Sequence, residues 1–262
     1  MELGLKDKVV LVTGGSKGIG LACAQAFAAE GARVAIASRD AAHLAAAADR
    51  LNAAGHGIFT HAADLCDADA AIGLADAVEA ALGPIDVLVT SAGAARRTPA
   101  GELTAAHWAA AMQAKYFTGI HAMQAVLPRM AARGSGSVVN IVGAGGKLAS
   151  PHHLPGGAAN AALMLASAGL ANAFGRQGVR VNAVNPGLVA TGRLQEGVAA
   201  QARAEGVDLE TVLQRHRQAL PLGRICEPEE VARVVLFLAS AASSYVSGAV
   251  LTVDGALTPM VV

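Results

Sequence analysis

The chain has 262 residues, a mass of 26.1 kDa and a formal net charge of zero, and 53% of its residues are hydrophobic. A chain this apolar buries enough surface to offset the entropy lost on ordering, which excludes an intrinsically disordered protein. Twenty basic residues balance twenty acidic ones without a basic tail or stripe, so no nucleic-acid partner is expected. No linker, repeat or change in composition divides the chain, and we predict a single domain over residues 1–262.

The cysteines and the apolar segments indicate the compartment. Cys23, Cys66 and Cys226 are odd in number, far apart and without CxxC spacing, which predicts buried thiols in a reducing compartment. Residues 1–8 are too polar for a signal peptide. The longest apolar stretch, 161–171, is too short for a bilayer, which takes about 20 residues. We therefore expect a cytoplasmic protein with no membrane partner, and we predict no metal site.

In chain order, short β-branched runs alternate with alanine-rich helical patterns. Several runs are apolar on both faces, as parallel strands covered by helices on both sides are. This alternation predicts an α/β fold with a doubly wound parallel sheet and helices on both faces. The predicted strands are 9–12, 33–38, 58–62, 85–90, 137–142, 180–183 and 250–253, and the predicted helices are 19–30, 41–54, 68–82, 105–132, 157–174 and 229–240.

Two segments depart from a simple strand and helix rhythm. Residues 192–220 are polar and helical in pattern between a strand and the next helix, and we predict an excursion that serves as a substrate lid. Residues 156–165 are apolar nearly all round, so a helix there must be buried on several sides. Burial within one subunit and burial at a subunit interface both fit this pattern.

The first strand leads into Thr13-Gly14-Gly15-Ser16-Lys17-Gly18-Ile19-Gly20 and then a helix. Glycines there allow a tight turn and let backbone N–H groups approach a pyrophosphate at the positive helix end. The spacing is GxxxGxG, and its position between strand and helix predicts a dinucleotide phosphate loop. The letters at 14–18 also match GxSxG, the nucleophile elbow of hydrolases. That alternative needs a late catalytic histidine and a nucleophile on the first strand, so it is disfavoured.

The second predicted strand ends at Ser38-Arg39-Asp40. An acidic residue at the strand tip binds a ribose 2′-hydroxyl, whereas an arginine accommodates a 2′-phosphate. The small Ser38, the adjacent Arg39 and Lys17 in the glycine-rich turn favour NADP(H) over NAD(H). A solvated Arg39 that contacts no cofactor is the alternative.

Six sequence features follow one another along the chain. They are the turn at 13–20, Asp64-Leu65, Ser91-Ala92-Gly93, Asn140, Asn185-Pro186-Gly187 with Thr191, and the closing Gly248 to Val253-Asp254-Gly255. In this order they resemble the short-chain dehydrogenase/reductase family over essentially the whole chain. The resemblance implies a single-domain Rossmann-type subunit with a sheet of about seven strands, usually in a homotetramer. It also implies a nicotinamide cofactor and a small-molecule substrate.

The resemblance also implies the cofactor contacts. Asp64 is expected to face the adenine, the backbone of 91–93 to line the cofactor, and the turn at 186–187 with Thr191 to hold the nicotinamide. Ser91 stands where the family more often has asparagine. The expected cofactor-binding residues are Gly14, Ser16, Lys17, Gly18, Ile19, Gly20, Ser38, Arg39, Asp64, Leu65, Ser91, Ala92, Gly93, Asn160, Pro186, Gly187, Val189 and Thr191.

Catalysis in the family rests on four side chains. A serine after strand five polarises the carbonyl, and a tyrosine thirteen residues later passes the proton. A lysine four residues further lowers the tyrosine pKa, and an asparagine on the preceding helix anchors a water relay. Carried over, these positions are Gly143, Gly156, Asn160 and Lys115, none of which has the family residue. No tyrosine lies within 117–244, so no other register restores the set.

Two interpretations of the catalytic positions follow. In one, the protein binds the cofactor without dehydrogenase activity, or uses the emptied pocket for isomerisation or elimination. In the other, different residues move the proton during reduction of a carbonyl or imine. His152 and His153 are then the candidate acids, because a histidine near its ordinary pKa of about 6.5 suits proton donation at neutral pH. Lys115 is their expected electrostatic partner, and Asn160 is expected to bind ribose hydroxyls.

Three further cations lie near the expected substrate side. Arg96 and Arg97, just beyond the 91–93 turn, could pair with an anionic substrate group, although a surface position is favoured. Lys147 is expected to be solvated or to contact the substrate. The missing serine and tyrosine side chains also leave volume beside the nicotinamide for a bulkier substrate.

Overall fold

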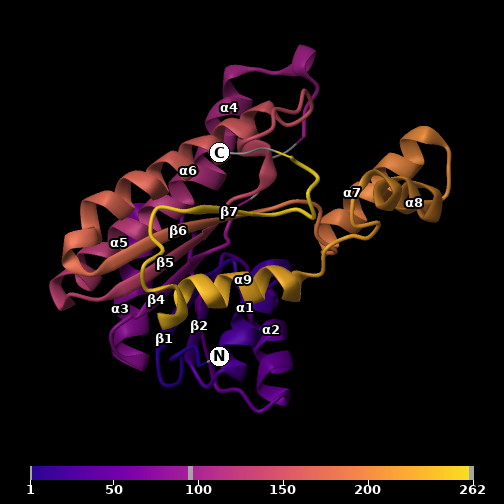
Figure 1. Ribbon diagram of the computed structural model, residues 1–262. Coiled ribbons are helices and arrows are strands. Elements are labelled where there is room, and N and C mark those ends of the chain that lie inside the picture. The colour runs from indigo at the N-terminus through magenta and orange to yellow at the C-terminus, as the bar shows by residue number, and fades with distance from the viewer. Residues whose placement is uncertain (1, 94–96, 260–262) are drawn as a thin grey trace.

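The computed structural model describes residues 2–93 and 97–259 and contains a seven-stranded sheet in the order β3-β2-β1-β4-β5-β6-β7. Every neighbouring pair of strands is parallel. The chain winds outward from β1 in one direction and from β4 in the other, so the predicted doubly wound Rossmann-type sheet is confirmed (Figure 1). The strands are β1 (Val9–Thr13), β2 (Arg33–Ser38), β3 (Ile58–Ala62), β4 (Val87–Thr90), β5 (Gly136–Ile141), β6 (Val179–Pro186) and β7 (Val250–Val253).

Helices cover both faces of this sheet, and each face has its own core. In β1, Val9 and Leu11 belong to one core and Val10 and Val12 to the other, which is why the run is apolar throughout. One face carries α1 (Gly18–Ala29), α2 (Ala41–Ala53) and α9 (Pro228–Ala239), and the other carries α3 (Ala68–Leu82), α5 (Thr118–Arg133) and α6 (Leu154–Phe174).

The predicted helix 105–132 is interrupted in the structure. It consists of α4 (Ala105–Ala111), the π-helical segment η2 (Met112–Phe117) and α5. The η2 residues contain neither glycine nor proline, so they carry no local signal for the wider turn. Such π-helical insertions often occur at functional sites, and this one contains Lys115.

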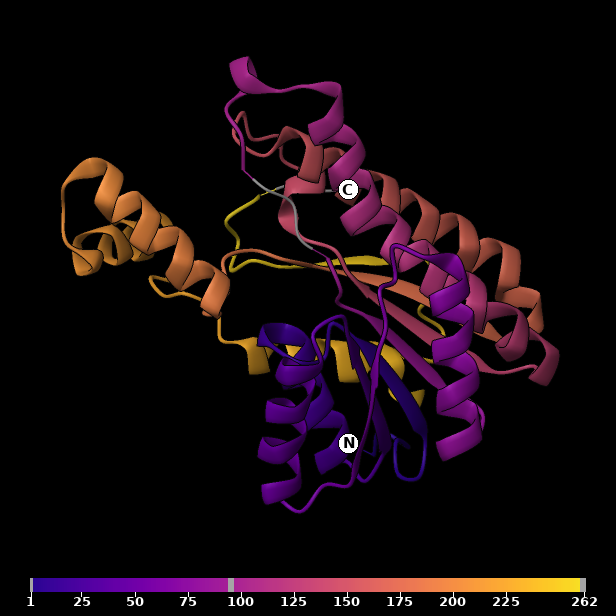
Figure 2. The same ribbon diagram turned by 180° about the vertical axis from the view of Figure 1, so that it is seen from behind.

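The segment 192–220 is helical, as predicted, and forms α7 (Gly192–Glu205) and α8 (Leu209–Ala219). The two helices pack on each other around Val198, Ala202 and Val212. They project away from the body of the molecule (Figures 1 and 2). A lid over the substrate therefore requires the pair to move, and it remains a prediction.

The segment Leu154–Gln177, which contains α6, is long and apolar enough to cross a membrane by length and composition, although the run at 161–171 had suggested otherwise. Half of its apolar window is buried within the fold, and the core helix of a globular protein passes the same test. In α6 the buried side includes Leu163, Met164 and Ser167. This helix therefore packs on one face of the sheet as part of the core.

The cysteines are free in the structure, and only one is fully buried. Cys23 is buried in α1, whereas Cys66 and Cys226 are partly exposed. Burial raises the pKa of the Cys23 thiol to about 12. The prediction of three buried thiols is therefore wrong for Cys66 and Cys226.

Candidate active site

The glycine-rich turn between β1 and α1 is held against neighbouring strands. The Gly14 N–H donates to the Ala37 carbonyl at 2.7 Å. Gly14 has a φ of +67°, and a Cβ there would lie 2.7 Å from the Ser91 carbonyl oxygen, so glycine is required. Lys17 at the start of α1 makes no capping hydrogen bond with its side chain. The first N–H groups of α1 and its positive end therefore suit a pyrophosphate.

The structure brings the segment after β6 to this turn. A Cβ on Gly18 would lie 3.2 Å from Cγ2 of Thr191. The Gly187 N–H donates to the Val253 carbonyl at 3.0 Å, which holds the turn at 186–187 against β7. Val189 is buried and pairs with Cys226 in a short bridge. The residues expected to hold the nicotinamide thus lie beside the expected phosphate loop.

At the end of β2, the acidic side chain is already engaged. The Asp40 carboxylate accepts the His43 N–H at 3.0 Å and pairs with His43 Nδ1 at 3.0 Å. The hydrogen bond from the His43 N–H lowers the pKa of Asp40, which caps α2. Lys17 and Arg39 are exposed and form no ion pair with a described residue. Ser38 is half-buried, and the exposed Arg39 that follows it is available to an anion, whereas the exposed Asp40 carboxylate caps α2.

The loop after β3 is tied to the helices beside it. Asp64 Oδ1 accepts the Cys66 N–H at 3.1 Å, and the Leu65 carbonyl lies 2.9 Å from His121 Nδ1. Gln113 in η2 donates its side-chain N–H to the Cys66 carbonyl at 2.7 Å. The loop is therefore fixed to η2 and α5, with Leu65 buried and Asp64 exposed at the expected adenine end.

The loop after β4 lies on the π-helical segment. The Ser91 N–H donates to the Thr13 carbonyl at 3.0 Å, and the Thr118 hydroxyl donates to the Ala92 carbonyl at 3.4 Å. Gly93 has a φ of +147°, and a Cβ there would lie 3.3 Å from the Lys115 Cα. This close approach sets Lys115 against the 91–93 turn.

Lys115 is a half-buried cation with an altered acidity. Burial, and next the charge of Arg193, lowers the pKa of Lys115 to about 8. Arg193 donates from Nη2 to the Gly93 carbonyl at 3.0 Å. Arg193 was not among the predicted site residues, and its only sequence signal is its position two residues after Thr191. It joins the start of α7 to the site.

His153, at the N-terminal end of α6, differs from the expected acid. Its Nδ1 is buried and has no partner among the described residues. Burial, followed by the charges of Lys115, Arg97 and Arg193, lowers the pKa of His153 to about 4. The imidazole is therefore neutral at pH 7, and the prediction that His153 titrates near its ordinary pKa is wrong.

The other predicted loop residues lie farther out. His152 is exposed, and its carbonyl accepts the Thr98 N–H at 3.1 Å. Arg97 is also exposed, although its charge reaches His153. Arg96 lies outside the described residues. The candidate role of His152 as proton donor therefore remains a prediction.

Asn160 closes the site from α6. Its side chain is buried, and Nδ2 donates to the Gly143 carbonyl at 3.2 Å. A Cβ on Gly145 would lie 3.2 Å from His153 Cδ2 and 3.8 Å from Asn160 Nδ2. The loop after β5 therefore lies close to both His153 and Asn160, while α6 packs on the η2 segment that carries Lys115. The structure brings Lys115, His153 and Asn160 to one end of the sheet.

Asn140 in β5 has a structural role. It accepts the Thr90 hydroxyl at 2.6 Å and donates to the Ser167 hydroxyl at 2.8 Å, with all three side chains buried. These bonds connect β4, β5 and α6. They fix the helix that carries Asn160 relative to the strand ends.

Comparison with known proteins identifies the class to which this site belongs. A family model described as enoyl-(acyl carrier protein) reductase matches residues 14–258. Gluconate 5-dehydrogenase from Gluconobacter oxydans (strain 621H) is 36% identical over 248 residues, which cover 95% of this chain and 93% of that protein. The chain belongs to the short-chain dehydrogenase/reductase family. This membership favours the cofactor loop at 13–20 over the hydrolase elbow.

Two solved structures extend the comparison. L-sorbose reductase from Gluconobacter frateurii, complexed with NADPH and L-sorbose, is similar with a TM-score of 0.94 and 28% identity, over 100% of both chains. An NADPH-bound short-chain oxidoreductase from Pseudomonas aeruginosa PAO1 contains, by its description, an atypical catalytic center. It is 35% identical with a TM-score of 0.88, over 97% of this chain and 98% of that one. The similarity supports an oxidoreductase that uses NADP(H).

Proposed function

We propose that the protein is an NADP(H)-dependent oxidoreductase that reduces a carbonyl or imine of a small molecule, with Lys115 as the proton donor. The observation that carries this proposal is the half-buried Lys115 ammonium, whose pKa of about 8 makes it a stronger acid than an ordinary lysine. It lies against the turn after β4, within electrostatic reach of His153. At neutral pH the ammonium is mostly protonated and ready to donate.

The residues present fit a nicotinamide cofactor. The uncapped start of α1 suits the pyrophosphate, and the turn at 186–187 with Thr191 would hold the nicotinamide end. When bound, the cofactor supplies a hydride. Lys115 Nζ gives one proton to the oxygen or nitrogen of the reduced group and regains it from solvent. Neutral His153 adds no charge beside Lys115, and Asn160 holds the loop after β5 in place through its hydrogen bond to the Gly143 carbonyl.

NADP(H) is proposed in preference to NAD(H). Arg39 and Lys17 are free of ion pairs among the described residues, and Asp40 is occupied as the cap of α2. A ribose 2′-phosphate would supply the missing anion. The NADPH in the L-sorbose reductase and Pseudomonas structures supports this preference.

The experiment that tests the function is NADPH consumption with a panel of ketoses and oxo sugar acids, for the wild type and Lys115→Met. Loss of a positioned acid lowers turnover by about 10²- to 10⁴-fold, while NADPH affinity stays within about threefold. Lys6→Met, at an exposed site near the N-terminus, is the matched control. Unchanged turnover in Lys115→Met would remove this lysine from the mechanism.

The alternative is a cofactor-binding family member without dehydrogenase activity, or one with isomerase or lyase chemistry. Glycine at positions 143 and 156, where the family has serine and tyrosine, favours it. Tight NADPH binding without NADPH consumption across the panel supports this alternative. Product analysis of the same mixtures then distinguishes a protein that binds NADPH without converting any substrate from an isomerase or lyase.

We also propose a cytoplasmic homotetramer with residues 192–220 as a substrate lid. The outer side of α6 exposes an apolar surface in which Leu165 is 77% exposed, and such a surface supports self-association.

The hydrogen bond from Arg193 to Gly93 supports the lid, because it connects α7 to the substrate side. Free cysteines support a reducing compartment.

A further inference from the structure

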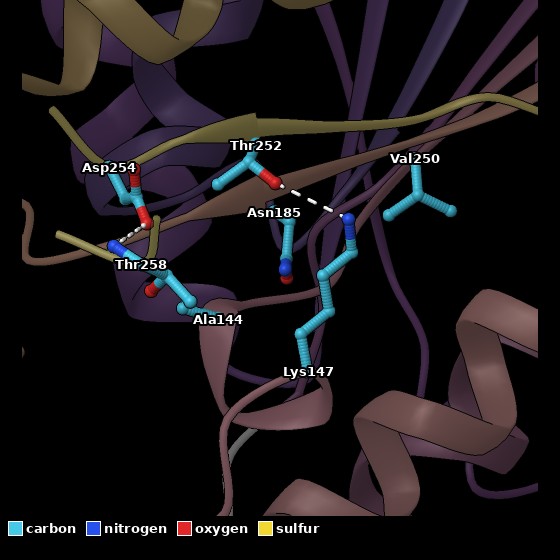
Figure 3. A pocket seen from close by; sticks show the side chains of 7 residues that line it. All are labelled: Ala144, Lys147, Asn185, Val250, Thr252, Asp254 and Thr258. Carbon is cyan, nitrogen blue, oxygen red and sulfur yellow. Dashed lines mark hydrogen bonds between the residues drawn. The ribbon is translucent and has the colours of Figure 1, made fainter. Parts of the chain in front are cut away.

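A cavity lined by both polar and apolar groups lies at the carboxyl end of β6 and along β7, beside the loop that follows β5 (Figure 3). Its volume is about 160 Å³, several times the roughly 30 Å³ that one water molecule occupies in the liquid. Its walls come from the segment after β5, the end of β6, the strand β7 and the C-terminal segment. None of the predicted cofactor or catalytic residues lines it.

Asn185 is the central feature of this cavity. The residue is only 1% exposed, and in Figure 3 its amide points into the space between the surrounding side chains. Both amide atoms, Nδ2 and Oδ1, are without a hydrogen-bond partner among the described residues. An unpaired buried amide is destabilising. The cavity is therefore suited to an occupant that both accepts and donates hydrogen bonds.

The opposite walls of the cavity carry complementary groups. On one side, Lys147 Nζ donates to the Thr252 hydroxyl at 3.4 Å and has no described carboxylate as an ion-pair partner. On the other side, the buried Asp254 carboxylate accepts the Thr258 N–H at 3.0 Å. The Thr258 hydroxyl is buried and unpaired within the described chain. Figure 3 shows Asn185 between these two walls.

We propose that this cavity binds the adjacent hydroxyl groups of a polyhydroxylated carbon chain. A hydroxyl group donates one hydrogen bond and accepts others, so it can satisfy both amide atoms of Asn185. It can also accept from Lys147 and donate to Asp254. A carboxylate only accepts and would face the charge of Asp254, whereas an alkyl chain would leave Asn185 unpaired.

The cavity adjoins the active site through the backbone. Ala144, which lines it, follows Gly143, whose carbonyl is bonded to Asn160. Asn185 precedes the turn at 186–187. We assign the cavity to the part of the substrate distant from the reduced group. This assignment rests on the proposed function, whereas the binding of a polyol to the cavity is independent of it.

The test is the binding of xylitol to the protein by ligand-observed NMR titration, in comparison with the diol of equal chain length that lacks the three inner hydroxyls. Xylitol should bind saturably and more tightly than the diol by about tenfold or more, because a site built for hydroxyl groups rejects an analogue without them. Lys147→Met and Thr252→Val should each weaken xylitol binding severalfold. The control Lys6→Met should leave it unchanged.

Asn185→Leu separates a binding role from a structural one. It should abolish the preference for xylitol and maintain or raise Tm, because it removes an unpaired buried amide. If this variant does not fold, Lys147→Met and Thr252→Val decide the question. Equal binding of xylitol and the diol, or unchanged binding in these two variants, means that the cavity holds only water and overturns the proposal. The titration measures binding and not turnover. If the protein binds xylitol as expected but reduces no substrate, the proposed function is contradicted and the polyol site is retained.

Discussion

At the scale of single residues, the chemistry of the site depends on cations that share a small volume. Burial, followed by the charge of Arg193, lowers the pKa of Lys115 to about 8, and burial, followed by the charges of Lys115, Arg97 and Arg193, lowers the pKa of His153 to about 4. A lysine so placed is acidic enough to donate near neutral pH, while the histidine stays neutral. In the proposed function, Lys115 and His153 therefore exchange the roles that the sequence suggested.

The pH dependence follows from this exchange. Reduction needs protonated Lys115, so kcat/KM for reduction should fall as pH rises through about 8, and oxidation of the product should rise over the same range. Arg193→Met removes a charge that lowers the Lys115 pKa, so it should move both profiles to higher pH. Arg203→Met, on the exposed surface of the same helix, should not move them. A profile centred near pH 4 would instead point to His153.

Lys115 also affects stability. Its pKa is lower in the folded chain than the ordinary value of 10.5, so the folded state binds fewer protons between pH 8 and 10.5. The free energy of unfolding should therefore rise with pH over this window as far as Lys115 contributes. Denaturant titration of the wild type and Lys115→Met isolates this contribution, because Lys115→Met should lack that rise. Parallel stability curves would show that the lysine is solvated.

Arg39 determines cofactor preference in the proposed function. Arg39→Asp should weaken NADPH binding by about 10- to 100-fold, the effect of one lost charge-assisted hydrogen bond. NADH binding should change little or improve. Calorimetric titration measures both affinities, and Arg50→Asp at the exposed end of α2 is the matched control. If Arg39→Asp binds NADPH as the wild type does, a solvated Arg39 is the correct interpretation.

At the scale of elements, α7 and α8 are the segment whose position bears most on activity. They pack mainly on each other and project from the body (Figure 2), while Arg193 holds the start of α7 to the turn after β4. NADPH with a substrate should increase amide protection in residues 192–220, as a closing lid requires. Hydrogen exchange measures this, with β1 as a protected internal reference. Unchanged exchange in the ternary complex would exclude closure.

At the scale of the whole molecule, the proposed tetramer can be tested at the outer side of α6. Leu165 is 77% exposed on a helix that otherwise supports the core. Leu165→Glu should convert the proposed tetramer to smaller species, as sedimentation velocity would detect, because it places a charge in an apolar interface. Leu209→Glu is the control, because Leu209 is 52% exposed on α8. A tetramer that persists in Leu165→Glu would place the interface elsewhere.

The sequence by itself determined the architecture of the sheet, whereas the predicted ends of β1, β5 and β6 differ from those in the structure. The apolar run of β1 and the alternation of strand and helix predict a doubly wound sheet, because burial on both faces is a local property of each strand. The glycine-rich turn is also local, since strand, turn and helix are contiguous. The strands β2, β3 and β7 have the predicted bounds.

Only the tertiary structure decided the chemistry of the site. The π-helical turn at Lys115, the contact of Arg193 with Gly93 and the unpaired amide of Asn185 all arise where distant segments meet. A pKa depends on burial and on charges that the fold brings close, and residue type alone reports neither. Local patterns therefore predict the scaffold, whereas acidity and unmet hydrogen-bonding capacity emerge only when the chain is packed.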